Sequence, residues 1–158
     1  MISEQEQEQI RLLSDYELYP QAVEFMKGIG RPLPATQING LLNVSLGSTY
    51  DELKRFVASQ HQRTTWSARD RHIPEFYRRL VPKIEDLEKL SLAIIKNRYE
   101  KVSREDEQAI SMALAREFIQ HLLAENAYRD AIKAFDAARS DEQRQDQRRS
   151  FNRGGQAR

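Results

Sequence analysis

The stretch SQHQRTTWSARDRHIPEFYRR, from Ser59 to Arg79, holds five arginines, two histidines and the only tryptophan of the chain. Arginine presents a planar fork of donors that matches a phosphate group, and it also stacks on nucleobases. An indole adds a stacking surface worth about 1–3 kcal/mol for each base that it contacts. These residue types therefore indicate binding to the backbone of a nucleic acid.

The distribution of charge along the chain favours the same interpretation. Residues 54–79 carry seven positive and two negative side chains, a net charge of +5, whereas the whole chain carries +1. The other 132 residues therefore total −4, so the positive charge is concentrated in one segment. The candidate RNA-binding residues are Lys54, Arg55, Arg63, Trp66, Arg69, Arg71, Arg78 and Arg79.

The same stretch has a structural interpretation. A run of charge is usually a solvated surface, and Trp66 can cover the core from a loop. Arg78 and Arg79 can lie on the outer face of a helix and pair with Glu75. Both interpretations stay open at the level of the sequence.

Other chemistry finds little support. The chain has no cysteine, which excludes disulfides, thiolate zinc sites and cysteine nucleophiles. The three histidines, His61, His72 and His121, lack the spacing of a metal site. Gly28 and Gly30 begin a G-x-G pattern, but no third glycine follows. We therefore predict a protein that is not an enzyme and that binds no cofactor and no metal.

The elements that must position the basic residues are helices. Ser3 and Glu6 have the spacing of a capping box, which predicts a first helix. Pro20 interrupts or kinks that helix near Tyr19, and Gly28 is suited to end it. No segment alternates long enough to predict a strand.

Two compact helices are expected next. Apolar residues from Ile38 to Leu46 form a short helix that Gly47 closes. Ser48 and Asp51 have the spacing to cap the following helix.

Two further helices complete the expected fold. Pro74 suits the first turn of an amphipathic helix, in which Pro82 predicts a kink or a late start. Ser103 and Asp106 cap a long helix that has no glycine or proline from Arg104 to Ala138. The sequence thus predicts an all-α bundle of about five helices, with one long C-terminal helix.

The expected organisation is one helical domain followed by a tail. The domain spans residues 1–138, with an acidic N-terminal helical segment at 1–30 and a core bundle at 31–138. Residues 139–158 are rich in arginine and have one aromatic residue, which predicts a disordered tail. The acidic N-terminus is unlike a signal peptide, and no apolar run is long enough to span a membrane. With the absence of cysteine, these features predict a cytoplasmic protein.

Two segments resemble a known family. LPATQINGLL (Leu33 to Leu42) and LAREFIQHLLAENAYRDAIKAF (Leu114 to Phe135) resemble helices of the small all-helical subunit of type III CRISPR effector complexes. The resemblance covers roughly Arg31 to Phe135, whereas the acidic N-terminal helix and the arginine-rich tail depart from it. It implies a non-catalytic structural subunit that lines the channel for the guide–target duplex of crRNA and target RNA. It also implies contact with other effector subunits and with further copies of the chain.

Two alternatives remain. The chain can be a helical adaptor or regulator whose basic patch binds an acidic protein. NGLLNVSLGSTYDELKRFV can also form a helix-turn-helix that binds DNA, with Gly47 in the turn. Asp51 and Glu52 at the leading end of its second helix disfavour contact with a DNA groove.

Overall fold

The computed structural model describes residues 1–63, 66–96 and 101–154, with side chains up to Phe151. This part of the chain is helical and contains no strand, which confirms the predicted all-α fold with a long C-terminal helix. The chain forms two compact units, Met1–Asn126 and Ala127–Arg158, which are described separately below.

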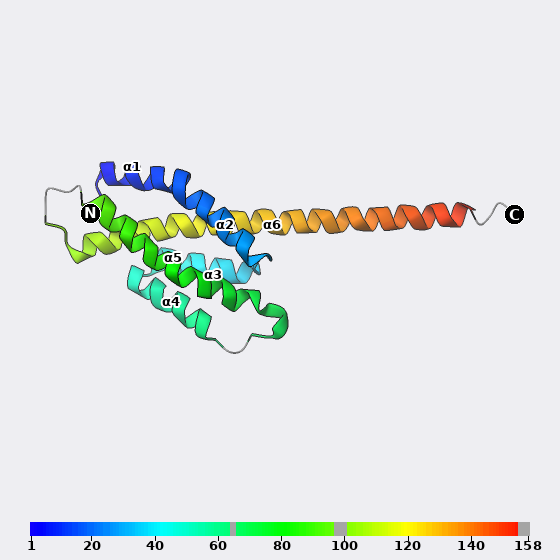
Figure 1. The fold of residues 1–158 in the computed structure, drawn as a ribbon, viewed down its shortest axis with the longest axis horizontal. Helices are drawn as coiled ribbons and strands as arrows, with labels where there is room; N and C mark the ends of the chain where they lie inside the picture. The colour runs from blue at the N-terminus through cyan, green and yellow to red at the C-terminus, as the bar shows by residue number, and fades with distance from the viewer. Residues whose placement is uncertain (64–65, 97–100, 155–158) are drawn as a thin grey trace. The chain divides into compact units, whose positions relative to one another are not determined.

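The first helix begins as predicted and then widens. Helix α1 (Glu4–Leu13) starts at a capping box, in which the Ser3 backbone N–H donates to the Glu6 carboxylate at 2.8 Å. A π-helical turn (Ser14–Leu18) follows, and α2 (Tyr19–Ile29) continues from it (Figure 1). The three segments therefore form one continuous helical element.

The proline and glycine signals of this element lie slightly away from where they were expected. Pro20 lies directly after the π-helical turn, where the hydrogen-bond pattern of the continuous helix changes, and it has no backbone N–H to donate. The predicted interruption near Tyr19 thus takes the form of a wide turn instead of a break. The helix ends at Gly30, which has a φ of 76°, and not at Gly28.

Helices α3 (Ala35–Gly47) and α4 (Tyr50–Gln62) form the predicted compact pair. The cap of α4 lies one residue later than expected, because Thr49 and Glu52 form the capping box. The Ser48 hydroxyl instead donates to a carbonyl in the last turn of α3. Ser48 therefore closes α3 and does not open α4.

Helix α5 (His72–Ile95) lies beside α4 and contributes most to the core (Figure 1). Pro74 lies in its first turn as predicted, and the helix continues through Pro82. The buried Tyr50 hydroxyl of α4 donates to the Ile84 carbonyl of α5 at 2.5 Å. This hydrogen bond ties α4 to α5 and is separate from the effect of Pro82, which removes the N–H that would bond the Arg78 carbonyl one turn earlier.

Helix α6 (Arg104–Gly154) corrects the prediction for the tail. In place of a disordered segment, residues 139–154 continue the helix, while 155–158 lie outside the described residues. The reason is local, since no glycine or proline lies between Arg104 and Gly154 and the tail is rich in strong helix formers. The compact body also ends at Asn126 instead of Ala138, because the following side chains are largely exposed.

Candidate nucleic-acid interface

One end of the body collects most of the predicted arginines. Here α2 ends, α3 begins, α4 ends and α5 begins (Figure 1). The Arg31 Nη1 donates to the Arg69 carbonyl at 3.4 Å, and the Tyr77 hydroxyl donates to Gln37 Oε1 at 3.4 Å. The first contact joins the α2–α3 connection to the α4–α5 connection, and the second joins α5 to α3. We call the set that gathers here the basic end: Arg31, Arg63, Arg69, Arg71, Arg78 and Arg79.

The α2–α3 connection that carries Arg31 is held by hydrogen bonds to Asn126 of α6. The Leu33 backbone N–H donates to Asn126 Oδ1 at 2.7 Å, and Asn126 Nδ2 donates to the Leu33 carbonyl at 3.1 Å. Both residues are buried, so one amide side chain satisfies two backbone groups. Arg31, two residues earlier, is therefore presented from a fixed loop.

Two arginines of the basic end are paired within the protein. Arg78 donates to the Glu75 carboxylate from Nε at 2.7 Å and from Nη2 at 2.6 Å. Arg79 Nε donates to the same carboxylate at 2.7 Å. Hydrogen bonds from Arg78 and then Arg79 lower the pKa of Glu75 to about 2. The structural interpretation is correct for these two residues, whose guanidinium groups share one carboxylate.

The other four guanidinium groups of the basic end are available. The side chains of Arg31, Arg63, Arg69 and Arg71 are exposed, and none forms an ion pair with the described residues. The nearby Asp70 carboxylate instead accepts a hydrogen bond from the Ser67 hydroxyl at 2.8 Å. Four cations without a carboxylate partner can neutralise phosphates, which gives salt-dependent binding.

Trp66 lies differently from a stacking platform. Its side chain is half-buried and packs against the hydrophobic core. Its Nε1 is buried and has no hydrogen-bond partner among the described residues. The indole thus covers the core from the connection between α4 and α5, which leaves phosphate contact as the main chemistry of this end.

Lys54 and Arg55 lie in the first half of α4, away from the basic end. Lys54 Nζ is 2.5 Å from Glu88 Oε1 and 3.2 Å from Asp51 Oδ1, and it lies 4.9 Å from the centre of the Tyr50 ring. Hydrogen bonding to Glu88 raises the pKa of Lys54. Arg55 Nε donates to a backbone carbonyl of its own helix at 3.3 Å. The structure therefore does not group these two residues with the other candidates.

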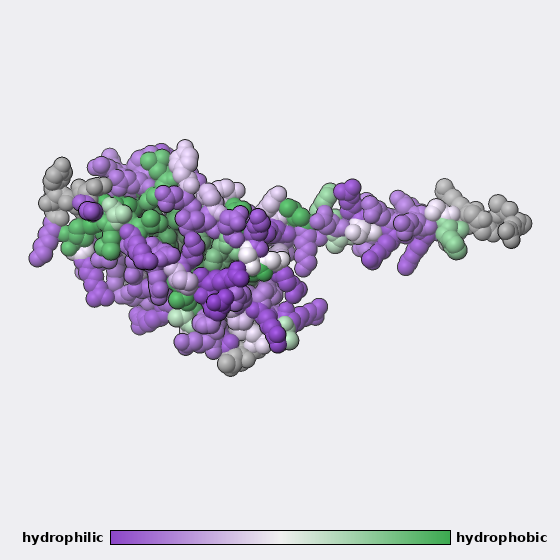
Figure 2. Space-filling model, in the orientation of Figure 1, coloured by the Kyte–Doolittle hydropathy of each residue, from purple (hydrophilic) through white to green (hydrophobic). Residues whose placement is uncertain are grey.

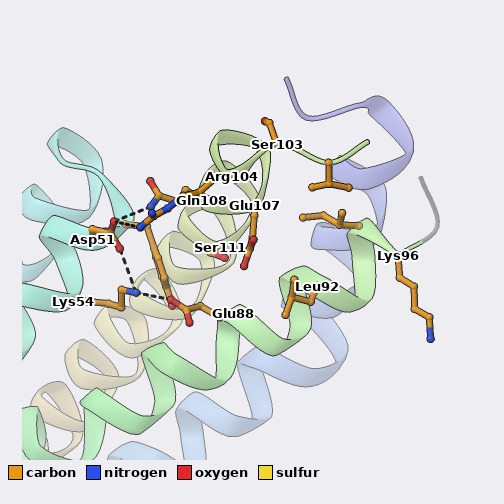
Figure 3. Close-up of a pocket in the computed structure, with 13 residues that line it drawn as sticks. Asp51, Lys54, Glu88, Leu92, Lys96, Ser103, Arg104, Glu107, Gln108 and Ser111 are labelled. Atoms are coloured by element: carbon orange, nitrogen blue, oxygen red, sulfur yellow. Dashed lines mark hydrogen bonds and ion pairs between the residues drawn. The ribbon is translucent and has the colours of Figure 1, made fainter. Parts of the chain in front are cut away.

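A cavity of about 760 Å³ opens beside Lys54 (Figure 3). Lys54 lies between Asp51 and Glu88, whereas Lys96 points away from the cavity. Asp51 also accepts from Gln108 Nε2 at 2.7 Å and lies 3.6 Å from Arg104. The hydrogen bond from Lys54 is the main cause that lowers the pKa of Asp51. The charged groups thus satisfy one another, and they tie the starts of α4 and α6 to α5.

A partly buried polar cluster was missed by sequence reasoning. The Ser14 hydroxyl, in the π-helical turn, donates to Glu117 Oε2 at 2.7 Å and lies 2.7 Å from His121 Nε2. A hydroxyl has one proton, so His121 must be the donor when Glu117 is the acceptor. A nucleophile and base would need the opposite direction of transfer. The cluster therefore anchors α6 to the turn, and the spacing of Glu117 and His121 on one helix face was its only sequence signal.

Two other kinds of site can be stated for the described part of the chain. No group of three histidine, cysteine, aspartate or glutamate side chains comes together there in a way that would hold a metal ion. None of the helices in these residues has the length and apolar character needed to cross a membrane.

Comparisons of the chain with models of protein families, with curated proteins and with solved structures find no match. The family resemblance of Leu33–Leu42 and Leu114–Phe135 thus stays a prediction. The basic end is the feature of the structure on which a function can be argued.

Proposed function

We propose that the protein binds RNA through the basic end as a non-catalytic structural subunit of a type III CRISPR effector ribonucleoprotein. One observation carries the RNA-binding part of the proposal. Arg31 comes from the α2–α3 connection, and Arg63, Arg69 and Arg71 come from the α4–α5 connection. They converge on one end of the body and have no carboxylate partner among the described residues. The type of complex rests on the family resemblance alone.

The contact proposed is with the phosphate backbone and not with bases. Guanidinium groups fit phosphate oxygens, while the one nearby indole packs against the protein core. The protein would then bind RNA without sequence preference, and base pairing between crRNA and target RNA would supply the specificity. Other effector subunits and further copies of the chain are the remaining proposed partners, and the cytoplasm is the proposed location.

The helix-turn-helix alternative has less support. The first turn of α4, which would lead into a DNA groove, is occupied by protein contacts. Asp51 accepts from Gln108 of α6, and the Glu52 carboxylate belongs to the capping box. The leading end of the helix therefore carries negative charge and lies against another helix.

The experiment compares two double charge reversals. Arg69→Glu with Arg71→Glu changes the basic end, and Lys96→Glu with Lys101→Glu changes two exposed cations elsewhere by the same total charge. Binding to fluorescent RNA of unrelated sequences is measured by anisotropy over a series of salt concentrations. If four phosphates are contacted, the logarithmic salt slope of the wild type should be about −3, at roughly 0.7 per contact on a single strand.

The first double variant should lose at least roughly tenfold in affinity, and the control should stay within about threefold. Equal losses in both variants would show binding to net charge instead of the basic end. No salt-dependent binding by the wild type would contradict the proposal. Binding of an acidic protein but not RNA would favour the adaptor alternative.

A further inference from the structure

The cavity beside Lys54 has one wall whose polar side chains have no partner. This wall is the start of α6, where Glu107 and Ser111 lie one helical turn apart and face α5 (Figure 3). Ser111 is 1% exposed, and its Oγ has no hydrogen-bond partner among the described residues. A buried hydroxyl that bonds to nothing in the protein is rare, so its expected partner is a group that enters the cavity.

The packing of α5 on α6 explains why Ser111 lacks a partner. A serine inside a helix can donate to the carbonyl four residues earlier. That carbonyl belongs to Glu107, and it accepts a hydrogen bond from the buried Ser91 hydroxyl of α5 at 3.1 Å. The Ser111 hydroxyl is therefore presented to the cavity and not to its own helix.

The Glu107 carboxylate is the charge that this cavity leaves without a partner. Glu107 is half-buried and forms no ion pair with the described residues. The other charged groups that face the cavity, two cations and two carboxylates, pair with one another: Lys54, Arg104, Asp51 and Glu88. Lys96 points away from the cavity (Figure 3). The cavity therefore has one negative charge in excess, which favours a cationic occupant.

The cation that fits this cavity is organic. A metal ion needs several oxygen or nitrogen ligands, and no group of three metal-ligating side chains comes together among the described residues. Beside the polar wall, the cavity is lined by Leu92, Ile95 and Val102. Hydrophobic side chains also gather where α5 ends and α6 begins (Figure 2). The volume of about 760 Å³ lies in the range of small-molecule sites.

We propose that the cavity binds a small aliphatic amine. An ammonium group has three N–H donors, so it can donate to the Glu107 carboxylate and to the Ser111 Oγ at the same time. The hydrocarbon chain lies against Leu92, Ile95 and Val102, where it is removed from water. The cavity and the basic end lie at opposite ends of α4 and α5, and the inference does not rest on RNA binding.

The test follows amide chemical shifts of the isotope-labelled full chain, freed of nucleic acid, during titration with four probes. Hexylamine has both the charge and the chain, hexanol has the chain alone, ammonium chloride has the charge alone, and hexanoate reverses the charge. Hexylamine should bind saturably in the millimolar range and shift the amide resonances of Glu107, Ser111 and Leu92. It should bind at least about fivefold more tightly than each of the other three probes.

Two substitutions assign the binding to the polar wall. Glu107→Gln keeps the shape of the side chain and should weaken hexylamine binding at least about fivefold. Glu105→Gln is the matched control, because Glu105 is an exposed acidic residue of the same first turn that does not line the cavity. It should change the affinity by less than about twofold.

Ser111→Ala separates a ligand contact from a structural role. The substitution should weaken hexylamine binding by about threefold or more, since one hydrogen bond to the ammonium is lost. The melting temperature of the free protein should not fall, because Ser111 Oγ has no partner there to lose. Circular dichroism verifies that each variant is folded.

Four results would overturn the inference. They are no saturable binding of hexylamine, binding of hexanol or hexanoate at least as tight as that of hexylamine, equal losses in Glu107→Gln and Glu105→Gln, and shifts that map to the basic end instead of the cavity. A clear fall in the melting temperature of Ser111→Ala would also count against it, because the hydroxyl would then already be satisfied within the protein. Because RNA is absent, none of these outcomes bears on the proposed function.

Discussion

At the scale of single residues, Glu75 controls how many guanidinium groups the basic end can offer. Its carboxylate accepts three hydrogen bonds from Arg78 and Arg79. An exposed pair of this kind contributes little to stability, but it competes directly with a phosphate for the same donors. Substitution of Glu75 can therefore show whether Arg78 and Arg79 contact RNA.

Glu75→Gln should strengthen RNA binding several-fold. The change releases Arg78 and Arg79, and two additional phosphate contacts would steepen the logarithmic salt slope by about 1.4 on a single strand. Anisotropy titrations in a salt series measure both quantities. Glu85→Gln is the control, since Glu85 is exposed on the same helix and forms no ion pair with the described residues. An unchanged slope for Glu75→Gln would show that these two arginines do not contact RNA.

The lowered pKa of Glu75 should make the stability of the protein depend on pH. Its pKa is lowered from 4.5 to about 2 by the hydrogen bonds from the two arginines. A carboxylate with a lowered pKa stabilises the fold above its unfolded pKa, and this contribution is lost as the pH falls from about 4.5 to about 2. The free energy of unfolding of the wild type should therefore fall relative to that of Glu75→Gln in this window. The difference should stay within about 1 kcal/mol, because the pair is exposed. Urea denaturation at pH 6 and pH 3 measures it, and parallel changes in the two proteins would contradict the account.

At the scale of elements, the π-helical turn and α6 depend on Ser14. Ser14 is buried, and Ser14→Ala removes the shared partner of Glu117 and His121, which are half-buried. The free energy of unfolding should fall by about 0.5–1.5 kcal/mol, the usual net contribution of a hydrogen bond, because water can reach the two half-buried partners. Ser59→Ala, which removes an exposed hydroxyl that bonds its own helix, should change it by less than about 0.5 kcal/mol. Chemical denaturation of both variants provides the comparison, and equally small effects would mean that the cluster has no structural role.

The elements themselves were largely predictable from local patterns. The capping box of Ser3 and the position of Pro74 were correct because each depends on neighbours in the sequence. The cap of α4 lies one residue later than predicted, because Ser48 and Thr49 are both good N-cap residues. The Ser48 hydroxyl bonds to a carbonyl of α3, and the Thr49 hydroxyl caps α4. The π-helical turn was not predictable, because it is held by Glu117 and His121 more than a hundred residues away.

The candidate site was only partly predictable for the same reason. A segment of high positive charge indicated the chemistry, and five of its arginines lie at the basic end, three with exposed guanidinium groups and two paired with Glu75. Arg31 was missed because it joins them through a tertiary contact with Arg69. Lys54 was included because it is near in sequence, although its partners are Glu88 and Asp51.

At the scale of the whole molecule, the chain forms two compact units, the body and the extension, Ala127–Arg158. The body, Met1–Asn126, contains the buried core and the basic end. The extension is a helix whose side chains from residue 139 to 151 are all exposed. Residues 139–153 have too few apolar side chains to form a core, but they contain no glycine or proline, so a helix can still form.

Removal of residues 139–158 should therefore leave the body intact. The free energy of unfolding of the shortened chain should stay within about 0.5 kcal/mol of that of the full chain, since no buried contact of residues 139–151 is lost. Thermal and urea denaturation followed at 222 nm measure this. A melting temperature lower by several degrees would show that the tail helix supports the body.

The central claim is that RNA binds at the basic end of the fold and not along the charged segment of the sequence. The most direct test compares an arginine that belongs only to the first with one that belongs only to the second. Arg31 lies outside the charged segment 54–79 but at the basic end, whereas Arg55 lies inside that segment but in the first half of α4. Arg31→Gln and Arg55→Gln each remove one positive charge from an exposed side chain. The account predicts that Arg31→Gln weakens RNA binding and makes the logarithmic salt slope shallower by about 0.7, while Arg55→Gln changes neither. Loss of binding in Arg55→Gln with none in Arg31→Gln would contradict it.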